Sequence, residues 1–244
     1  MLINWVKGES KVELEKELNE FLRLHPADAW AQRELANIYL GKRDFERAEK
    51  HIALAHEVDP NGPATYVLRA AMHSSRNETA QAIEQYREAI KHSIDSEYAI
   101  AGLINCCDSK AKRKTQLQFV LDELNRQVGL GDGLITYHSL AQTCLDPPEL
   151  LATLRDTLKK GDDRWQAWVV VIRQLSDMQQ HDEAIELAKK ASKKFPLLPR
   201  IWMELATANA ASGRIDEEIA ALRKAKEINP TWGDIARSLA EALE

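Results

Sequence analysis

The sequence predicts an all-α protein in which pairs of short helices stack along the chain to form a helical solenoid. The first observation is a 34-residue pattern that recurs in residues 29–62, 165–198 and 199–232, with small and large apolar residues at the same offsets. The second is that apolar residues recur at the three- and four-residue spacing of amphipathic helices. The third is a proline at the thirty-second position of each stretch: Pro60, Pro196 and Pro230.

Composition and charge argue against several function classes. The 244 residues are 44% hydrophobic and 29% charged, and with only 10 Gly and 8 Pro they fit a folded chain without long disordered linkers. The formal net charge of −5 argues against nucleic acid as a partner, because nucleic-acid binders are more often basic. No stretch reaches the ~18 apolar residues that span a bilayer, and the N-terminus lacks the features of a signal peptide. We therefore expect a cytoplasmic protein with neither a membrane nor a nucleic-acid partner.

The cysteine and histidine residues form no pattern that predicts a metal site or a disulfide framework. Three Cys are an odd number, and no pair of Cys or His has the spacing of a zinc site. Cys107 and Cys144 fall at packing positions of predicted helices, where a small apolar residue is expected. No Ser–His–Asp or Cys–His set supports nucleophilic catalysis. We expect no cofactor, no metal and no enzymatic activity.

The first predicted elements are a lone helix and two repeats. Residues 9–26 are expected to form an N-terminal half-repeat or capping helix that ends at Pro26. Residues 29–96 hold two clear repeats, each a pair of helices. In the first of them, Gly41 begins the turn and Asp44 is a candidate N-cap for the second helix.

The rest of the chain is predicted to contain a degenerate middle, two further repeats and a final helix. Residues 97–164 keep the helical periodicity but lose the small alanines of the pattern. Residues 165–232 return to it as two clear repeats, and residues 233–244 form a C-terminal capping helix with a polar outer face. We predict that residues 1–244 form a single solenoid of about six repeat units with terminal helices.

Two short motifs in the middle suggest function only superficially. Lys110, Lys112, Arg113 and Lys114 are predicted to lie in a turn, where a solvated loop is favoured over a docking site for acidic groups. The glycine-rich stretch 129–133 has no preceding strand and no Gly-Lys-Ser/Thr sequence, so it is expected to be a flexible junction and not a phosphate loop.

The pattern resembles the tetratricopeptide repeat family. Residues 29–62 carry the matching Leu35, Ala36, Tyr39, Ala48, Ala55 and Pro60. Residues 199–232 carry Trp202, Leu205, Ala206, Gly213, Leu222, Ala225 and Pro230. The resemblance implies a right-handed superhelix of antiparallel helix pairs that acts as a binding scaffold and not as an enzyme.

The resemblance also implies a binding surface, because the first helix of each pair lines a concave groove in this family. Side chains at positions 2, 5, 9 and 12 usually face that groove. On this chain the predicted partner-binding residues are Trp30, Arg33, Asn37, Tyr98, Asn105, His138, Arg173, Arg200 and Met203. The same positions also include Val67, Gln142 and Thr207. Arg and aromatic side chains are frequent anchors of interfaces, which favours a protein or peptide as the ligand.

Arg33 and Asn37 resemble half of the carboxylate clamp with which some members of the family hold a peptide C-terminus. The other half does not match, because this chain has Leu68, Tyr98 and Gly102 where the clamp has polar or basic residues. We therefore expect Asn37 to bond to neighbouring backbone or water.

The leading functional prediction is a non-enzymatic protein–protein interaction scaffold that binds a peptide or a partner helix in the groove. One alternative is a regulatory or targeting region of a larger enzyme, for example a transferase, whose catalytic part lies outside this sequence. Another is a self-associating module, in which the glycine-rich middle or the terminal helix exposes apolar surface and a homo-oligomer forms.

Overall fold

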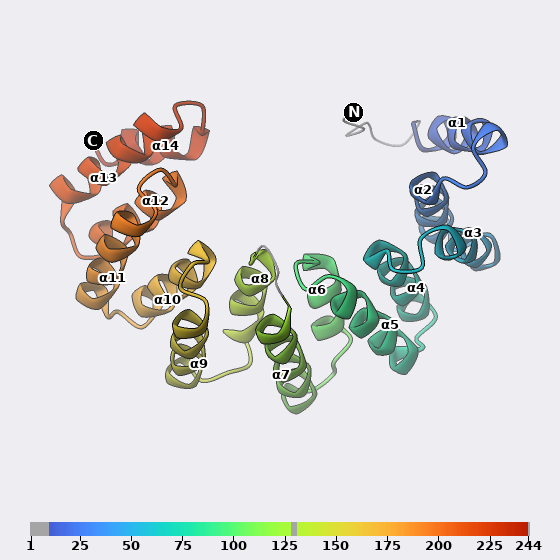
Figure 1. The fold of residues 1–244 in the computed structure, drawn as a ribbon, viewed down its shortest axis with the longest axis horizontal. Helices are drawn as coiled ribbons and strands as arrows, with labels where there is room; N and C mark the ends of the chain where they lie inside the picture. The colour runs from blue at the N-terminus through green and yellow to red at the C-terminus, as the bar shows by residue number, and fades with distance from the viewer. Residues whose placement is uncertain (1–9, 128–130, 244) are drawn as a thin grey trace. The chain divides into compact units, whose positions relative to one another are not determined.

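The computed structural model describes residues 10–127 and 131–243, and within these ranges it contains fourteen α-helices and no β-strand (Figure 1). The chain divides into two compact units, Met1–Glu123 and Leu124–Glu244, which are described separately. The first seven helices are α1 (Ser10–Leu24), α2 (Ala29–Gly41), α3 (Phe45–Val58), α4 (Pro63–Ser75), α5 (Thr79–His92), α6 (Glu97–Asn105) and α7 (Lys110–Arg126). The others are α8 (Asp132–Ala141), α9 (Pro147–Lys160), α10 (Trp165–Asp177), α11 (His181–Lys194), α12 (Pro199–Ala210), α13 (Ile215–Ile228) and α14 (Gly233–Glu241).

The first unit is built from helical hairpins whose first helices stack on one another. Helix α2 packs on α3, and α4 packs on α5, so each 34-residue stretch folds as one hairpin. Helix α2 also contacts α4, and α4 contacts α6, while α3 and α5 each pack against the first helix of the next hairpin. The result is a layer of first helices beside a layer of second helices, which is the arrangement that the repeat pattern predicts.

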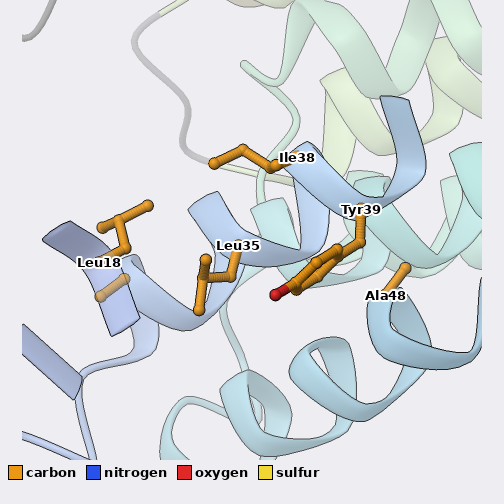
Figure 2. Packing of buried hydrophobic residues seen from close by; sticks show 6 residues of the cluster. Leu18, Leu35, Ile38, Tyr39 and Ala48 are labelled. Carbon is orange, nitrogen blue, oxygen red and sulfur yellow. The ribbon is translucent and has the colours of Figure 1, made fainter. Parts of the chain in front are cut away.

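Small and large side chains alternate in the core of this unit. Figure 2 shows Leu18 of α1 beside Leu35 and Ile38 of α2, with Tyr39 next to Ala48 of α3. Leu35 and Ala48 are fully buried, and Ala48 has no bulk to keep the two helix backbones apart. Burial of a leucine of this kind contributes about 1.5–3 kcal/mol to the free energy of folding. Because Leu18 packs against this cluster, α1 covers an apolar face of the first repeat.

Local sequence signals set several helix starts. The carboxylate of Asp28 accepts a hydrogen bond from the backbone N–H of Ala31 at 2.8 Å, and that of Asp44 accepts from Arg47 at 3.1 Å. Each bond satisfies one of the free N–H groups of the first helical turn. The predicted N-cap at Asp44 is thereby confirmed. Pro63 is the first residue of α4, where its missing N–H costs nothing.

The second unit repeats the same layering. Helix α10 contacts both α8 and α12, which gives a layer of first helices, while α9, α11 and α13 pack against them. Helix α14 packs on α13. Cys107, in the first unit, and Cys144, in this one, lie just after α6 and α8 and not within these helices, and both are buried free thiols, as predicted.

The structure corrects the placement of the basic run. Lys110, Lys112, Arg113 and Lys114 lie in the first turns of α7 and not in a connecting turn. Lys112 pairs with Asp108 at 2.9 Å, and Arg113 donates to the carbonyl of Cys107 at 3.2 Å, so local acceptors hold these two side chains. The helix continues further toward its N-terminus than the sequence pattern indicates because these long side chains favour helical backbone.

Part of the predicted glycine junction, Gly129 and Leu130, lies outside the described residues. Gly131 has a φ of 102° and precedes α8, a conformation that glycine adopts without strain. Among the described helices, none is both long enough and apolar enough to cross a membrane.

Candidate functional site

The first helices of the first unit line a hollow of about 630 Å³. Its lining comes from α2, from α4 and from the segment that leads into α6. Four of the predicted groove residues lie in it: Trp30, Arg33, Asn37 and Tyr98. The other lining residues are Glu34, Pro63, Ala64, Val67, Leu68, Ser93 and Ser96. We call this surface the unit 1 hollow.

One face of α2 forms a wall of the unit 1 hollow. Trp30, Arg33, Glu34 and Asn37 are spaced three and four residues apart, so they point to the same side of the helix. The Trp30 side chain is left with 46% of its surface exposed, although tryptophan is usually well covered. Exposed aromatic surface inside a concave apolar lining is typical of a site that a partner covers.

Tyr98 is the most exposed aromatic side chain among the described residues. It lies at the second position of α6 and is 81% exposed. Helix α4 comes between α2, which carries Trp30, and α6, which carries Tyr98. Its Ala64 and Val67 side chains also line the hollow. The hollow therefore has an aromatic group on its first and last helices and small apolar side chains between them.

Arg33 is held by an acidic residue of the same repeat. Its Nη1 donates to Oδ2 of Asp59 at 3.1 Å, and the Arg33 side chain is only 19% exposed. Asp59 follows α3, at the C-terminal end of the hairpin that α2 begins. Much of the positive charge that the sequence offers to an acidic ligand is therefore neutralised inside the repeat. The Arg33–Asp59 pair therefore argues against a carboxylate clamp at this position.

The second unit has a hollow of its own, of about 420 Å³, which we call the unit 2 hollow. It brings together the other predicted groove residues of this unit: His138, Arg173, Arg200 and Met203. The remaining lining residues are Ser139, Gln142, Ser176, Asp177, Glu204, Thr207, Trp232 and Asp234. They come from α8, α10 and α12 and from the start of α14.

A buried carboxylate organises the charges of the unit 2 hollow. Glu204 is 7% exposed and accepts hydrogen bonds from both predicted arginines. Arg173 donates to Oε1 through Nη2 at 2.6 Å, and Arg200 donates to Oε1 through Nε at 3.1 Å. Arg200 also lies over the Trp232 ring, with its Cζ 5.9 Å from the ring centroid. Arg173 thus fastens α10 to α12, the Arg200–Glu204 pair lies within α12, and both arginines line the hollow.

His138 is buried at the edge of the same hollow. Its Nε2 lies 3.1 Å from Oε1 of Gln174, whose own amide donates to the carbonyl of Pro147 at 3.3 Å. Burial lowers the pKa of His138 below its ordinary value of 6.5, while the Gln174 hydrogen bond and Asp177 oppose the shift. The ring is therefore held in its neutral form as part of the packing between α8 and α10.

Asn105 lies in neither hollow. It is exposed at the last residue of α6, and its role in binding stays a prediction. Sequence reasoning missed Glu34 and Trp232, which line the two hollows. Glu34 follows Trp30 by four residues, so a helical projection places it on the same face. Trp232 lies at the very end of the last repeat, where the pattern gives no position for a groove residue.

The described residues contain no group of three or more His, Cys, Asp or Glu that could hold a metal ion. The side chains that face the two hollows include aromatic, aliphatic, amide, hydroxyl and charged groups. Such a lining suits recognition by packing and hydrogen bonding.

Part of the second unit matches a known protein family. Residues 173–231 match the family model described as tetratricopeptide repeat. Residues 173–231 are therefore identified as tetratricopeptide repeats. The match runs from within α10 to the segment before α14, so it includes the Arg173–Glu204 contact. The matched residues fall within the two 34-residue stretches 165–198 and 199–232.

Solved structures of other repeat proteins are similar at low sequence identity. A chain of the APC/C hetero-tetramer Cut9–Hcn1 is 16% identical, with a TM-score of 0.48, over 96% of this chain and 46% of that chain. A tetratricopeptide repeat protein from Parabacteroides merdae is 13% identical, with a TM-score of 0.49, over 97% of this chain and 100% of that chain. YrrB, a tetratricopeptide repeat protein with an unusual peptide-binding site, is 14% identical, with a TM-score of 0.36, over 91% and 96%.

This chain spans less than half the length of the Cut9–Hcn1 chain that it matches. No curated protein matches the sequence. The peptide-binding site and the assembly named for two of these structures belong to those proteins.

Proposed function

We propose that this protein is a non-enzymatic interaction scaffold whose tetratricopeptide repeats hold a peptide segment in the unit 1 hollow. The observation that carries the proposal is the pair of exposed aromatic side chains, Trp30 and Tyr98, in one concave and mostly apolar lining. Burying these two rings under a ligand would remove a large apolar surface from water, at about 25 cal/mol per Å².

The shape of the unit 1 hollow suits a chain segment better than a small molecule. Its lining comes from three successive layers of the stacked first helices, α2, α4 and the start of α6. A peptide that lies across these helices can meet one lining group from each of them in turn. Asn37, Ser93 and Ser96 offer polar groups along the same surface for hydrogen bonds with a peptide backbone.

The unit 2 hollow supports a binding role less directly. Its arginines are engaged with Glu204, and Asp177 accepts a hydrogen bond from Gln142 at 2.5 Å. A ligand there would have to compete with bonds that hold the first helices together. The unit 1 hollow offers its aromatic groups without such competition, since the side chains of Trp30 and Tyr98 make no hydrogen bond with any residue in the described part of the chain.

A selection of peptides from a phage-displayed random library tests the proposal. Peptides selected on the wild-type chain should bind with micromolar or better affinity. The double variant Trp30→Ala, Tyr98→Ala should weaken them by at least about tenfold, because aromatic anchors of an interface typically contribute more than 1 kcal/mol each. Both side chains are exposed, so circular dichroism should show an unchanged fold.

The control is Val58→Ala, which removes an exposed apolar side chain of the same unit outside the hollow. It should bind every selected peptide as the wild type does. Selected peptides that bind the double variant as tightly as the wild type would place the site elsewhere and refute the proposal.

A further inference from the structure

The charges of the unit 1 hollow are unequal once their partners are considered. Arg33 and Glu34 are the two ionised side chains of its lining. Arg33 is paired with Asp59 at 3.1 Å and is 19% exposed. Glu34 has no ion pair and no hydrogen bond of its side chain with any residue in the described ranges. The hollow therefore presents one negative charge whose counter-charge is missing.

The position of Glu34 relates this charge to the aromatic surface. It lies one helical turn after Trp30 on α2, so the two side chains are neighbours on the helix face that lines the hollow. Val67 and Ala64 of the neighbouring α4 line the same hollow. An exposed indole, aliphatic side chains and a free carboxylate are therefore gathered within one cavity.

A long basic side chain matches all three groups. Lys and Arg carry an aliphatic stem that packs on apolar surface and a cationic head that remains polar. The stem would lie against Trp30 and Val67 while the head pairs with Glu34, and the indole face attracts a cation as well. An acidic side chain would meet the repulsion of Glu34, and it could engage Arg33 only by competing with Asp59.

We propose that the unit 1 hollow selects peptide segments that carry Lys or Arg next to an apolar side chain. This inference rests on the proposed function and specifies the chemistry of its ligand. The net charge of −5 on the whole chain acts in the same direction, because it attracts basic segments during encounter.

The test uses the random phage-displayed library, selected separately on the wild type, on Glu34→Gln and on Glu34→Lys. Wild-type selections should be enriched in Lys or Arg beside an apolar residue, and Glu34→Lys selections should lose that enrichment. A selected peptide is then synthesised with its basic residue intact and with that residue replaced by Met. The intact peptide should bind Glu34→Gln about five- to tenfold more weakly than the wild type, as expected for a charge-assisted contact of about 1 kcal/mol.

Three controls make the result specific. Glu57→Gln changes the net charge equally but lies at an exposed site of α3 outside the hollow, so it should bind like the wild type. Added salt should weaken the intact peptide more than the Met peptide, because a solvent-accessible ion pair is screened. For the Met peptide, wild type and Glu34→Gln should bind alike.

The outcomes separate this inference from the proposed function. Peptides that require Trp30 and Tyr98 but are acidic or uncharged, or that bind Glu34→Gln as tightly as the wild type, would overturn the basic-ligand inference alone. Selections that yield no peptide dependent on Trp30 and Tyr98 would overturn both.

Discussion

The indole Nε1 of Trp202 donates a 3.0 Å hydrogen bond to the carbonyl oxygen of Pro196, six residues earlier. The same contact recurs in two other repeats. Trp168 donates to the carbonyl of Asp162 at 2.8 Å, and the hydroxyl of Tyr66 donates to the carbonyl of Pro60 at 2.9 Å. In each case the aromatic residue is the fourth of its 34-residue stretch, and the bond ties a first helix to the turn before it.

Replacing Trp202 by Phe should therefore destabilise the protein. The variant keeps an aromatic ring but loses the N–H that satisfies the Pro196 carbonyl, which costs about 1 kcal/mol. Urea unfolding followed by circular dichroism measures the change. Trp30→Phe is the matched control, because the indole of Trp30 lines the unit 1 hollow and donates no hydrogen bond to any of the described residues. Equal stability losses in the two variants would contradict the role assigned to the Trp202 bond.

Gly102→Ala should be destabilising even though alanine favours helices. A Cβ on residue 102 of α6 would overlap the ring of Tyr86, which α5 packs against this position. The cost of such overpacking is about 1–3 kcal/mol. In the background Tyr86→Leu, which frees the space, the same substitution should cost measurably less.

The matched control for that substitution is Gly41→Ala, since nothing lies within 4 Å of a Cβ at the end of α2. It should leave the urea midpoint unchanged or raise it slightly. A Gly102→Ala variant as stable as Gly41→Ala would show that the Tyr86 contact does not constrain the site.

Glu204→Gln should lower the stability of the second unit. The substitution leaves Arg173 and Arg200 without the carboxylate that both of them contact, and Glu204 is buried. Because the arginines are partly solvated, we expect a cost of about 1–3 kcal/mol, below that of a fully buried pair. Glu186→Gln, at an exposed Glu–Lys pair on α11, should change the unfolding free energy by less than about 0.5 kcal/mol. Indistinguishable variants would mean that Glu204 does not fasten α10 to α12.

Protonation of His138 should make the protein less stable in acid. Burial lowers the pKa of this ring in the folded state below its ordinary value of 6.5, so below that pH the unfolded chain binds a proton more readily than the folded chain. The stability that comes from the neutral ring is complete above pH 6.5 and is lost as the pH falls through the lowered folded pKa. The difference between the urea midpoints measured above and below pH 6.5 should be smaller in His138→Gln than in the wild type.

Some pH dependence should remain in that variant, because burial also lowers the pKa of His51. A His138→Gln curve that coincides with the wild-type curve would refute the assignment.

Much of the fold could be predicted because its signals are local. Pro26, Asp44 and Pro63 begin or end helices through the geometry of their own backbone and side chains. The buried alanines and leucines at fixed offsets identified the faces that pack within each hairpin. The basic run at Lys110 was misplaced because charged residues suit both a loop and the first turn of a helix.

The candidate site could be predicted in part. The structure places Trp30, Arg33 and Tyr98, which occupy groove positions of the pattern, in one hollow, because the stacking of first helices repeats with the sequence; their role in binding stays a prediction. The engagement of Arg33 with Asp59, 26 residues away, could not be read from the pattern, since it depends on how the two ends of a hairpin meet. The same is true of Glu204, which lies 31 residues after Arg173 in the next repeat.

The aromatic hydrogen bond at the start of α4, α10 and α12 joins a donor and an acceptor that are six residues apart in the chain. A donor and an acceptor this close in sequence travel together whenever a segment of the gene is copied. A newly duplicated unit would thus arrive with its own fastening to the preceding turn, before any contact with its other neighbours had been refined. Growth and shortening of such arrays during evolution then require fewer compensating substitutions than changes within a fold whose contacts are distant in sequence.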